Sequence, residues 1–191
     1  MLCNTFVCED QNGFWNCRGN KRRWQKNILA LTKICRKKKQ NYLSYGSEGI
    51  GLSLEQEMAF LDNVAHSSKD VFYVVKMKDE IVGMGSYTTF SSPRMSHRGE
   101  IGLCIRQSAW HLGIGHALMD RLLDFAKNQA KADLVSLEVC HDNRRAISLY
   151  QHYGFQKIGT FEGFFKIDSK LIDYDIMLLK LEKVHEISWT F

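Results

Sequence analysis

The chain has 191 residues, of which 45% are hydrophobic and 25% charged, and its formal net charge is +5. These values are typical of a single globular domain and exclude wholesale disorder. Proline occurs once, at Pro93, which excludes collagen-like and proline-rich architectures. No apolar run approaches the roughly 20 residues of a membrane-spanning helix, and Met1–Asp10 lacks the pattern of a secretory signal. We therefore expect a soluble, cytoplasmic protein without a membrane partner.

The N-terminal part of the chain carries the excess of positive charge. Residues 1–12 show no periodicity and predict a loose tail, and Phe14–Cys17 is the only candidate for a strand before the first helix. The spacing of apolar residues predicts that helix over Arg22–Arg36. Ten basic and no acidic residues lie in Arg18–Lys39, so the remaining 16 basic and 21 acidic residues have a net charge of −5.

Three interpretations of this basic stretch remain open. It is an exposed helix face, a docking patch for an acidic partner or RNA, or the result of an altered start of the chain. Cations alone bind phosphates without reading a sequence, so we do not expect nucleic acid as a partner.

A second helix follows a loop over Asn41–Gly51. The segment Ser53–Gln56 has the pattern of a capping box, which begins a helix. The apolar residues that then mark one helix face are Leu54, Met58, Leu61 and Ala65.

The sequence period then changes to that of strands. Val71–Lys76 and Ile81–Phe90 are rich in β-branched and aromatic residues, and the three polar residues between them suggest a hairpin. Ser91–His97 is predicted as a loop and Gly99–Ile105 as a further strand.

Two strand–helix–strand units complete the predicted fold. The first helix has its apolar residues at i, i+4, i+7 and i+8, namely Leu118, Leu122, Phe125 and Ala126. The other predicted elements are strands over Leu134–Cys140, Phe155–Phe161 and Tyr174–Leu181, and a helix over Asn143–Tyr153 that ends at Gly154. These units, placed after antiparallel strands, predict an α/β fold with a mixed sheet covered by helices.

Two glycines lie where the longer helix begins. The segment Glu100–Gly115 (EIGLCIRQSAWHLGIG) ends a strand near Ile105 and then reaches Gly113 and Gly115. Glycines let an anion approach the backbone, and the free N–H groups of a first helical turn bind phosphate. Alternatively, the glycines only let helix and sheet pack closely. Leu118 replaces the third glycine of a dinucleotide-binding motif, and no Gly-Lys-Ser/Thr follows, so neither a Rossmann nor a Walker A motif is supported.

The following helix carries a second set of candidate residues. Asn143, Ile147 and Tyr150 share one helix face, with Asn143 and Tyr150 about 10 Å apart along the axis at ~1.5 Å per residue. They suit a long, thin ligand. The alternative is that Asn143 is an N-cap and Tyr150 a core aromatic residue.

The six cysteines predict neither a disulfide framework nor a metal site. They contain no C-x-x-C pair, and the histidines show no metal-ligand spacing. Cys104 and Cys140 lie in apolar runs, where free cysteine behaves as a small hydrophobic residue. We expect free thiols and no metal.

Together, the two blocks resemble the GNAT superfamily of acetyl-CoA-dependent N-acetyltransferases over roughly Leu52–Leu181. The family motif Q/R-x-x-G-x-G/A is matched by Trp110–Gly115, with Trp110 departing from the motif at its first position. The family pattern N-x-x-A-x-x-L-Y-x-x-x-G-F is matched without a gap by Asn143–Phe155. The resemblance implies a three-layer α-β-α sandwich with a mixed, splayed sheet, in one domain over residues 13–183 with a C-terminal extension at 184–191.

The resemblance implies that acetyl-CoA is the cosubstrate and lies between the strands Gly99–Ile105 and Leu134–Cys140. Backbone groups near Ile105 would pair with the pantetheine arm and stabilise the developing oxyanion, and the amides of Leu112–His116 would hold the diphosphate. The implied binding residues are Cys104, Ile105, Leu112, Gly113, Ile114, Gly115, His116, Asn143 and Tyr150. Arg144 and Arg145 either bind outer phosphates or belong to a solvated helix face.

The resemblance also implies two catalytic residues. Tyr150 matches the family position that protonates the departing CoA thiolate, and a phenol with a pKa near 10 holds its proton at neutral pH. Glu100 resembles the frequent general-base position, with Glu138 or a water as the alternatives. Side chains alternate along a strand, so each carboxylate has the alternative of facing solvent.

The implied reaction is transfer of acetyl to a primary amine by direct attack. The acceptor is a small amine, a protein N-terminus or a lysine, as in the branch that includes ribosomal-protein and small-amine acetyltransferases. The segments Gln40–Leu52 and Glu162–Asp173 would shape its site, and their aromatic and acidic residues suit a cationic amine: Tyr42, Tyr45, Glu48, Phe164, Phe165, Asp168 and Asp173. The alternative function is a non-catalytic acyl-CoA-binding or RNA- or ribosome-associated module. The sequence does not determine the oligomeric state, and a homodimer is one of the alternatives.

Overall fold

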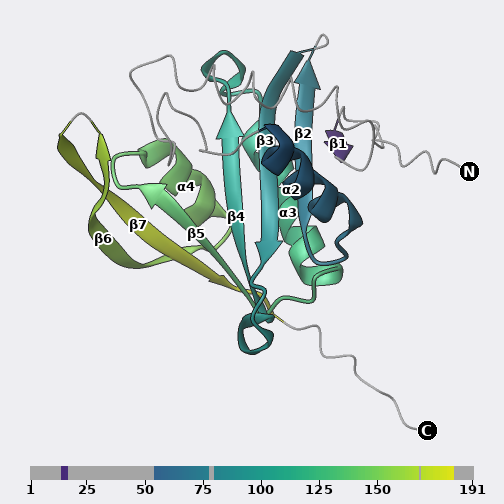
Figure 1. The fold of residues 1–191 in the computed structure, drawn as a ribbon. Coiled ribbons are helices and arrows are strands. Elements are labelled where there is room, and N and C mark those ends of the chain that lie inside the picture. The colour runs from purple at the N-terminus through teal and green to yellow at the C-terminus, as the bar shows by residue number, and fades with distance from the viewer. Residues whose placement is uncertain (1–13, 17–53, 78–79, 168, 183–191) are drawn as a thin grey trace, which may run out of the picture.

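The described residues form a mixed seven-stranded sheet with helices on both faces (Figure 1). The computed structural model describes residues 14–16, 54–77, 80–167 and 169–182. The predicted tail at 1–12, the helix over Arg22–Arg36, the whole basic stretch and the C-terminal extension at 184–191 lie outside the described residues.

The sheet has the strand order β1-β2-β3-β4-β5-β7-β6. All neighbouring strands are antiparallel except β4 and β5, which are parallel. The strands are β1 (Phe14–Asn16), β2 (Val71–Met77), β3 (Glu80–Thr89), β4 (Arg98–Ile105), β5 (Leu134–Cys140), β6 (Gln156–Ile167) and β7 (Lys170–Lys180). The helices are α2 (Leu54–His66), α3 (Ile114–Asn128) and α4 (Arg144–His152), with 3-10 turns at Pro93–Met95 and Gln107–Ala109.

Apolar spacing explains why these segments take these forms. The four apolar positions predicted for α3 are all buried, and Val135, Leu137 and Val139 of β5 turn their side chains to one face of the sheet at a period of two. Helix α4 begins after Asn143 and ends before Gly154, whose φ of 87° lies in the left-handed region that favours glycine. The mixed α/β sheet and the order of its elements are therefore confirmed.

The end of the chain differs from the prediction. We expected Glu162–Asp173 to be a connection, but β6 continues to Ile167 and turns directly into β7 at Lys170. Gly163 has a φ of 66° and lies within an irregular step of the β6–β7 register, between Phe161 and Phe165. The strand therefore does not end near Phe161 as predicted, because it pairs with β7 again beyond the irregular step.

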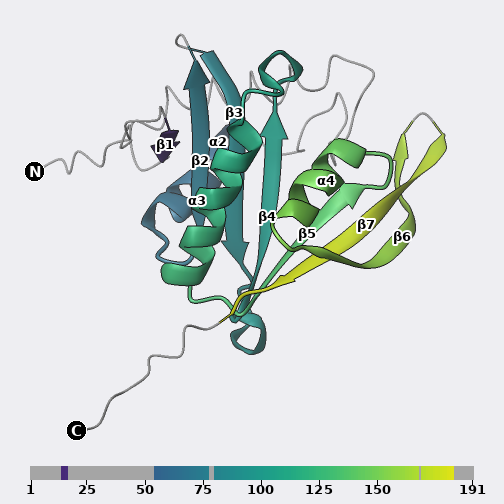
Figure 2. The ribbon, with the colours of Figure 1, turned by 180° about the vertical axis from the view of Figure 1, so that it is seen from behind.

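The helices divide between the two faces of the sheet. Helix α2 lies in front of the sheet in Figure 1, and α3 lies in front of it when the molecule is turned by 180° (Figure 2). Helix α4 packs on the same face as α3, because its Tyr150 belongs to the same buried cluster as Phe125 of α3 and Leu137 of β5. This arrangement is the predicted three-layer sandwich. None of the described helices has the length and apolar composition of a bilayer span.

The parallel strands β4 and β5 share only a short ladder. Their pairs run from Arg98↔Leu134 to Glu100↔Ser136, and among the described residues no ladder pair joins the two strands beyond that point. Both strands continue, β4 to Ile105 and β5 to Cys140, and they separate toward their carboxyl ends (Figure 1). The sheet is therefore splayed between these strands, as the resemblance implied.

A glycine at the start of β4 makes room for a buried tyrosine. Tyr87 of β3 is fully buried and packs against Phe125 with 5.9 Å between ring centroids. Its ring covers the backbone of Gly99, and a Cβ at Gly99 would overlap Cζ and Oη of that ring. The position therefore accepts only glycine as long as Tyr87 stays in place.

We expect Gly99→Ala to lower the free energy of unfolding by about 3 kcal/mol, because the buried ring has to move to admit one methyl group. Gly102→Ala on the same strand is the matched control: Gly102 is exposed and its added Cβ would meet only the Ser86 hydroxyl, at 3.3 Å. We expect this control to change the free energy by less than about 0.5 kcal/mol. Urea unfolding of both variants measures the difference, and equal effects would contradict the overlap.

Candidate functional site

The edge of β4 that faces β5 carries backbone groups outside any ladder. The Arg106 N–H, just after β4, donates to the carbonyl of Val82 on the β3 side (2.8 Å). Because alternate residues of a strand direct their N–H and C=O groups to opposite sides, those of Leu103 and Ile105 point toward β5. The two strands have already separated there, so this edge can pair with an extended ligand.

The segment after β4 leads into a glycine turn at the start of α3. Gly113 is the N-cap residue with a φ of 76°, and a Cβ there would meet no atom within 4 Å. The first helical bond runs from the Ala117 N–H to the Gly113 carbonyl (3.0 Å). The N–H groups of Ile114, Gly115 and His116 precede that bond and have no partner within the helix, which is the arrangement that binds anions.

The two glycines of the turn have different surroundings. A Cβ on Gly115 would lie 3.1 Å from the Leu149 side chain of α4, so close packing of two helices explains this glycine. Gly113 is exposed, and neighbouring Leu112 is 56% exposed. Close packing therefore accounts for Gly115, although its near neighbour is α4 and not the sheet that we expected. The positive φ of Gly113 favours glycine there, and the approach of an anion to this exposed residue stays a prediction.

The structure brings the two sequence blocks together. The Tyr153 hydroxyl of α4 donates to the His116 carbonyl (2.9 Å) and lies 2.7 Å from Oδ1 of Asp120 on α3. The Arg145 guanidinium lies 4.0 Å from the centroid of the Trp110 ring in the segment before the turn. Helix α4 therefore runs beside the glycine turn and the first turns of α3.

On α4, the predicted site residues Asn143 and Tyr150 both have structural roles. The Asn143 side chain accepts from the Ala146 N–H (3.3 Å) and caps the helix. Tyr150 is 6% exposed and contacts Phe155, with 6.0 Å between ring centroids. Burial raises the pKa of the Tyr150 phenol well above its ordinary value. The phenol therefore keeps its proton throughout the neutral range.

The two candidate carboxylates lie on the opposite face of the sheet from Tyr150. Glu100 and Glu138 alternate with buried residues that face α3 and α4, so their side chains point to the face that carries α2. Burial, followed by the negative charge of Glu138, raises the pKa of Glu100. Burial also raises the pKa of Glu138. The negative charge of Glu138 on β5 thus acts on Glu100 of the neighbouring strand β4.

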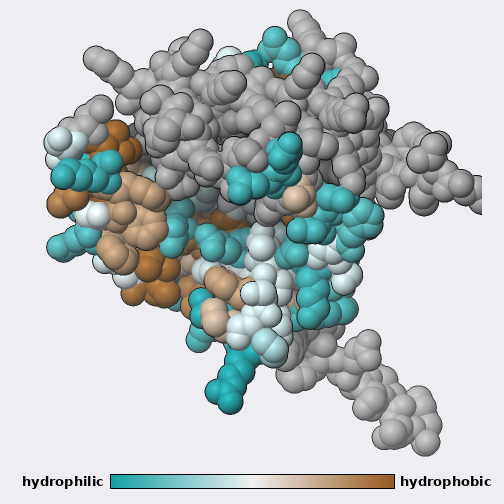
Figure 3. All heavy atoms as spheres, viewed as in Figure 1, coloured by the Kyte–Doolittle hydropathy of each residue, from teal (hydrophilic) through white to brown (hydrophobic). Residues whose placement is uncertain are grey.

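Aromatic side chains adjoin these carboxylates on the β6–β7 hairpin. Tyr174 stacks on Phe164 (5.2 Å between centroids) and contacts Phe165 edge to face (4.9 Å). Burial and the nearby Cys140 and Glu138 raise the pKa of the Tyr174 phenol well above its ordinary value. Hydrophobic side chains gather on the surface over this hairpin (Figure 3).

The residues that were predicted to shape the acceptor site differ in where the structure places them. Phe164 and Phe165 belong to this aromatic group, whereas Asp173 accepts from the Gly163 N–H (2.8 Å) and supports the irregular strand. The remaining predicted acceptor residues, Tyr42, Tyr45, Glu48 and Asp168, lie outside the described residues.

A buried charged group that the sequence did not predict supports the start of α4. Asp175 of β7 is 3% exposed, and its carboxylate contacts Lys157 Nζ (2.7 Å), His141 Nδ1 (3.0 Å) and the Thr160 hydroxyl (2.8 Å). Burial alone would raise its pKa, but these three partners outweigh burial and lower it to about 2. Because His141 directly follows β5, the group fixes the loop that leads into α4.

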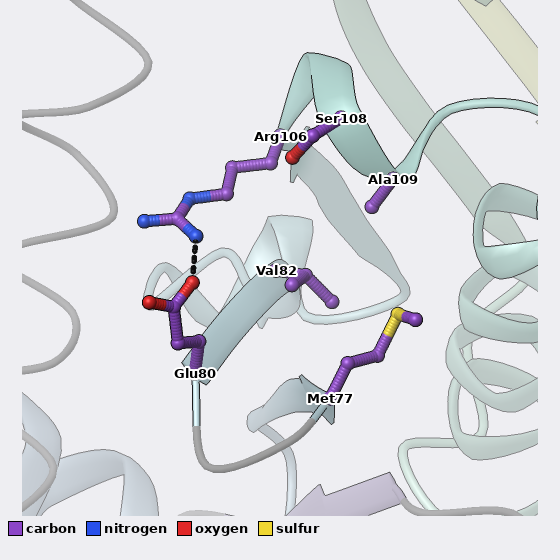
Figure 4. A pocket seen from close by; sticks show the side chains of 6 residues that line it. All are labelled: Met77, Glu80, Val82, Arg106, Ser108 and Ala109. Atoms are coloured by element: carbon purple, nitrogen blue, oxygen red, sulfur yellow. Dashed lines mark hydrogen bonds and ion pairs between the residues drawn. The ribbon is translucent and has the colours of Figure 1, made fainter.

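A pocket of about 350 Å³ lies on the other side of β4. It is lined by side chains from the β2–β3 hairpin and from the 3-10 turn after β4, and an ion pair between Arg106 and Glu80 spans one side of it (Figure 4). Its lining contains none of the predicted site residues. The pocket faces β3, whereas the unpaired edge of β4 faces β5.

Two of the six cysteines lie in the described part of the chain. Cys104 and Cys140 are buried free cysteines, as predicted, and the other four cysteines lie outside the described residues. Within the described part of the chain, no three histidine, cysteine or acidic side chains come together as a metal site would require.

Comparison with known proteins identifies the family. The chain belongs to the acetyltransferase (GNAT) family, whose model matches residues 40–155. The acetyltransferase of the GNAT family from Streptococcus pneumoniae superimposes with a TM-score of 0.79 at 22% identity, over 88% of this chain and 99% of that one. The yncA protein of Salmonella typhimurium, solved with its cofactor acetyl-CoA, superimposes with a TM-score of 0.72 at 15% identity, over 91% and 97%. At these identities the structural likeness concerns the fold.

Two curated relatives match shorter segments. The L-amino acid N-acetyltransferase AaaT of Escherichia coli is 32% identical over 81 residues, which is 42% of this chain and 50% of AaaT. The N-alpha-acetyltransferase RimI of Mycobacterium tuberculosis is 40% identical over 55 residues, 29% of this chain and 32% of RimI. The matched segments thus span half of the first relative and a third of the second.

We expect Asp175→Asn to lower the free energy of unfolding by about 2 kcal/mol at pH 7, the amount that corresponds to a carboxyl pKa lowered from 3.8 to about 2. A lowered pKa stabilises the folded state above pH 3.8, and this stabilisation is lost as the pH falls toward 2. The difference between variant and wild type should therefore shrink below pH 4. Denaturant unfolding at several pH values measures it, and a difference independent of pH would contradict a charged Asp175.

Proposed function

We propose that the chain is an N-acetyltransferase that transfers acetyl from acetyl-CoA to a primary amine of a small molecule or a protein. The observation that carries the proposal is the parting of β4 and β5, which leaves an unpaired strand edge leading to a glycine turn. Membership of the GNAT acetyltransferase family supports the reaction class. Acetyl-CoA as the cosubstrate is also supported by yncA, the structural neighbour solved with it.

The chemical groups of acetyl-CoA suit those that this edge presents. Its pantetheine arm is extended and carries amides, so it can pair with the backbone of Leu103 and Ile105 as a short extra strand. Its diphosphate is an anion and suits the free N–H groups of Ile114, Gly115 and His116. Asn143 caps α4, and we propose that it also contacts the arm. Cys104 is the buried neighbour that supports this stretch of β4.

Tyr150 and Glu100 divide the proton transfers between the two faces of the sheet. The amine nitrogen forms a bond to the acetyl carbon, the bond from that carbon to sulfur breaks, and the leaving thiolate takes the phenolic proton of Tyr150. The attacking amine loses its proton to Glu100, directly or through a water. Because these residues lie on opposite faces, the amine enters from the α2 face and the thiolate leaves toward α4.

The acceptor side favours a cationic amine. Glu100 and Glu138 provide negative charge, and the aromatic rings around Tyr174 provide π faces next to it. The matched relatives act on such groups: AaaT is an L-amino acid N-acetyltransferase, and RimI is an N-alpha-acetyltransferase. We therefore propose α-amino groups, of free amino acids or of peptide N-termini, as the first acceptors to test.

The proposed function is tested by incubating the full chain with acetyl-CoA and a panel of amino acids, peptide N-termini and polyamines, with release of free thiol as the readout. Acetyl transfer to an α-amino group is the expected result. Binding of CoA without transfer to any acceptor of the panel would contradict the enzymatic function and leave a non-catalytic acyl-CoA-binding protein.

We expect Tyr150→Phe to lower kcat about 100-fold while the affinity for CoA changes less than about twofold, because the variant keeps the ring and loses the acid. Steady-state kinetics and calorimetry measure the two effects. Tyr153→Phe is the control, since it removes a phenol of the same helix that donates to α3. An unchanged kcat in Tyr150→Phe would remove the residue from the proton transfer.

The pH dependence separates the two carboxylates. A base acts only when deprotonated, so kcat/KM should fall on the acid side with the raised pKa of Glu100. Glu100→Gln should abolish this acid limb and lower kcat/KM at pH 7 about 100-fold. Glu138→Gln should shift the limb to lower pH, because it removes the negative charge that raises the pKa of Glu100. The reverse pattern would make Glu138 the base.

A further inference from the structure

The contact between Trp110 and Arg145 joins the glycine turn to α4. The Arg145 Cζ lies 4.0 Å from the centroid of the indole ring, a distance that gives a cation–π interaction. The indole is fixed in turn, since its Nε1–H donates to the Ile105 carbonyl at the end of β4 (3.0 Å). One arginine of α4 is thus held by a ring that is anchored to the unpaired edge of β4.

The neighbours of Arg145 along α4 show which part of the turn it faces. Leu149, one turn further on, packs where a Cβ of Gly115 would lie. Tyr153, two turns further on, donates to the His116 carbonyl. Residues at i, i+4 and i+8 form one stripe of a helix, so Arg145 is the member of this stripe nearest the segment before α3. Its guanidinium is therefore held beside the N-terminal end of that helix.

The positive charge of Arg145 beside the start of α3 favours the binding of an anion. The N-terminus of a helix carries partial positive charge, so a guanidinium beside it is unfavourable unless an anion lies between them. Arg145 is exposed, and among the described residues it forms no ion pair with a carboxylate. The cation–π contact with the indole uses the charge of the guanidinium and none of its N–H donors, which stay able to bind an anion. Those N–H groups match two phosphoryl oxygens in bidentate fashion.

We propose that Arg145, oriented by Trp110, binds the diphosphate of coenzyme A together with the N–H groups at the start of α3. The proposal rests on the proposed function. Arg145 contacts the phosphoryl oxygens, and Trp110 is a positioning residue that restricts the arginine to the geometry in which it does so. Lysine would keep the charge at this site but not the paired donors of the guanidinium.

The test is calorimetric titration with CoA and with dephospho-CoA, which lacks the 3′-phosphate but keeps the diphosphate. We expect Arg145→Ala to weaken the binding of both ligands about 10-fold, the loss expected for a charge-assisted hydrogen bond. Arg145→Lys should recover part of this loss. Lys127→Ala, which removes one charge at the far end of α3, is the control and should leave both affinities within twofold.

A double-mutant cycle tests the role of Trp110. We expect Trp110→Leu to weaken CoA binding, and we expect Arg145→Ala to add little loss in that background, because the arginine is no longer oriented. Fully additive losses would contradict the positioning role. Thermal unfolding of each variant checks that the fold is retained. If Trp110→Leu is unstable, Arg145→Lys still tests the assignment of the arginine, because lysine keeps the charge and loses the paired donors.

The remaining outcomes are distinguishable. If Arg145→Ala binds CoA as tightly as the wild type does, the assignment of Arg145 is overturned, whereas the proposed function is not. A loss confined to CoA, with dephospho-CoA unaffected, overturns the assignment to the diphosphate and points to the 3′-phosphate. Wild type that binds neither ligand overturns the proposed function, and the assignment of Arg145 with it.

Discussion

The parting of β4 from β5 is the constraint on which the rest of the structure depends. A parallel sheet normally satisfies the backbone groups of both strands, and unpaired buried groups are costly. After three pairs the ladder stops, although both strands continue. One of these backbone groups has a partner within the chain, because the Trp110 indole donates to the Ile105 carbonyl. The remaining edge is left to water or to a ligand with amides of its own.

The same topology brings two helix N-termini together. Since β4 and β5 are parallel, the helices that follow them begin at the same edge of the sheet. Leu149 against Gly115 and the Tyr153 hydroxyl on the His116 carbonyl hold these helices side by side. On the other side of α4, the Asp175 carboxylate fixes the loop at His141. The helix that carries Asn143 and Tyr150 is therefore supported from two sides, which a site that positions a long ligand requires.

Much of the fold follows from local patterns in the sequence. The periods of two and of 3.6 predict β2 to β5 and α4 with errors of at most one residue at their ends, and they predict the buried face of α3, because these apolar faces are long and regular. The prediction that the strand ends at Phe161 was wrong for a local reason. In the sequence, the irregular step at Gly163 cannot be distinguished from a strand end until the partner strand is known. The glycine turn and the block from Asn143 to Phe155 were found because each is a contiguous motif.

Other parts of the site depend on contacts that no local pattern reports. The effect of Glu138 on the pKa of Glu100 arises from two strands whose facing positions are set by sheet register. The ion pairs of Asp175 bring together three segments, and nothing in the sequence around Asp175 distinguishes it from an exposed carboxylate. The contact of Arg145 with Trp110 likewise joins residues from two helix starts. A tryptophan where the family motif has glutamine or arginine was the one sign of it in the sequence.

The most direct test of the proposed ligand position is amide hydrogen exchange with and without saturating CoA. If the pantetheine arm pairs with the edge of β4 and the diphosphate with the turn, exchange should slow at the amides of Leu103, Ile105, Ile114 and Gly115. The amides of β3, already paired on the other side of β4, should change little. Slowed exchange around the pocket between Met77 and Ala109, with Leu103 and Ile105 unaffected, would place the ligand elsewhere and contradict the proposal.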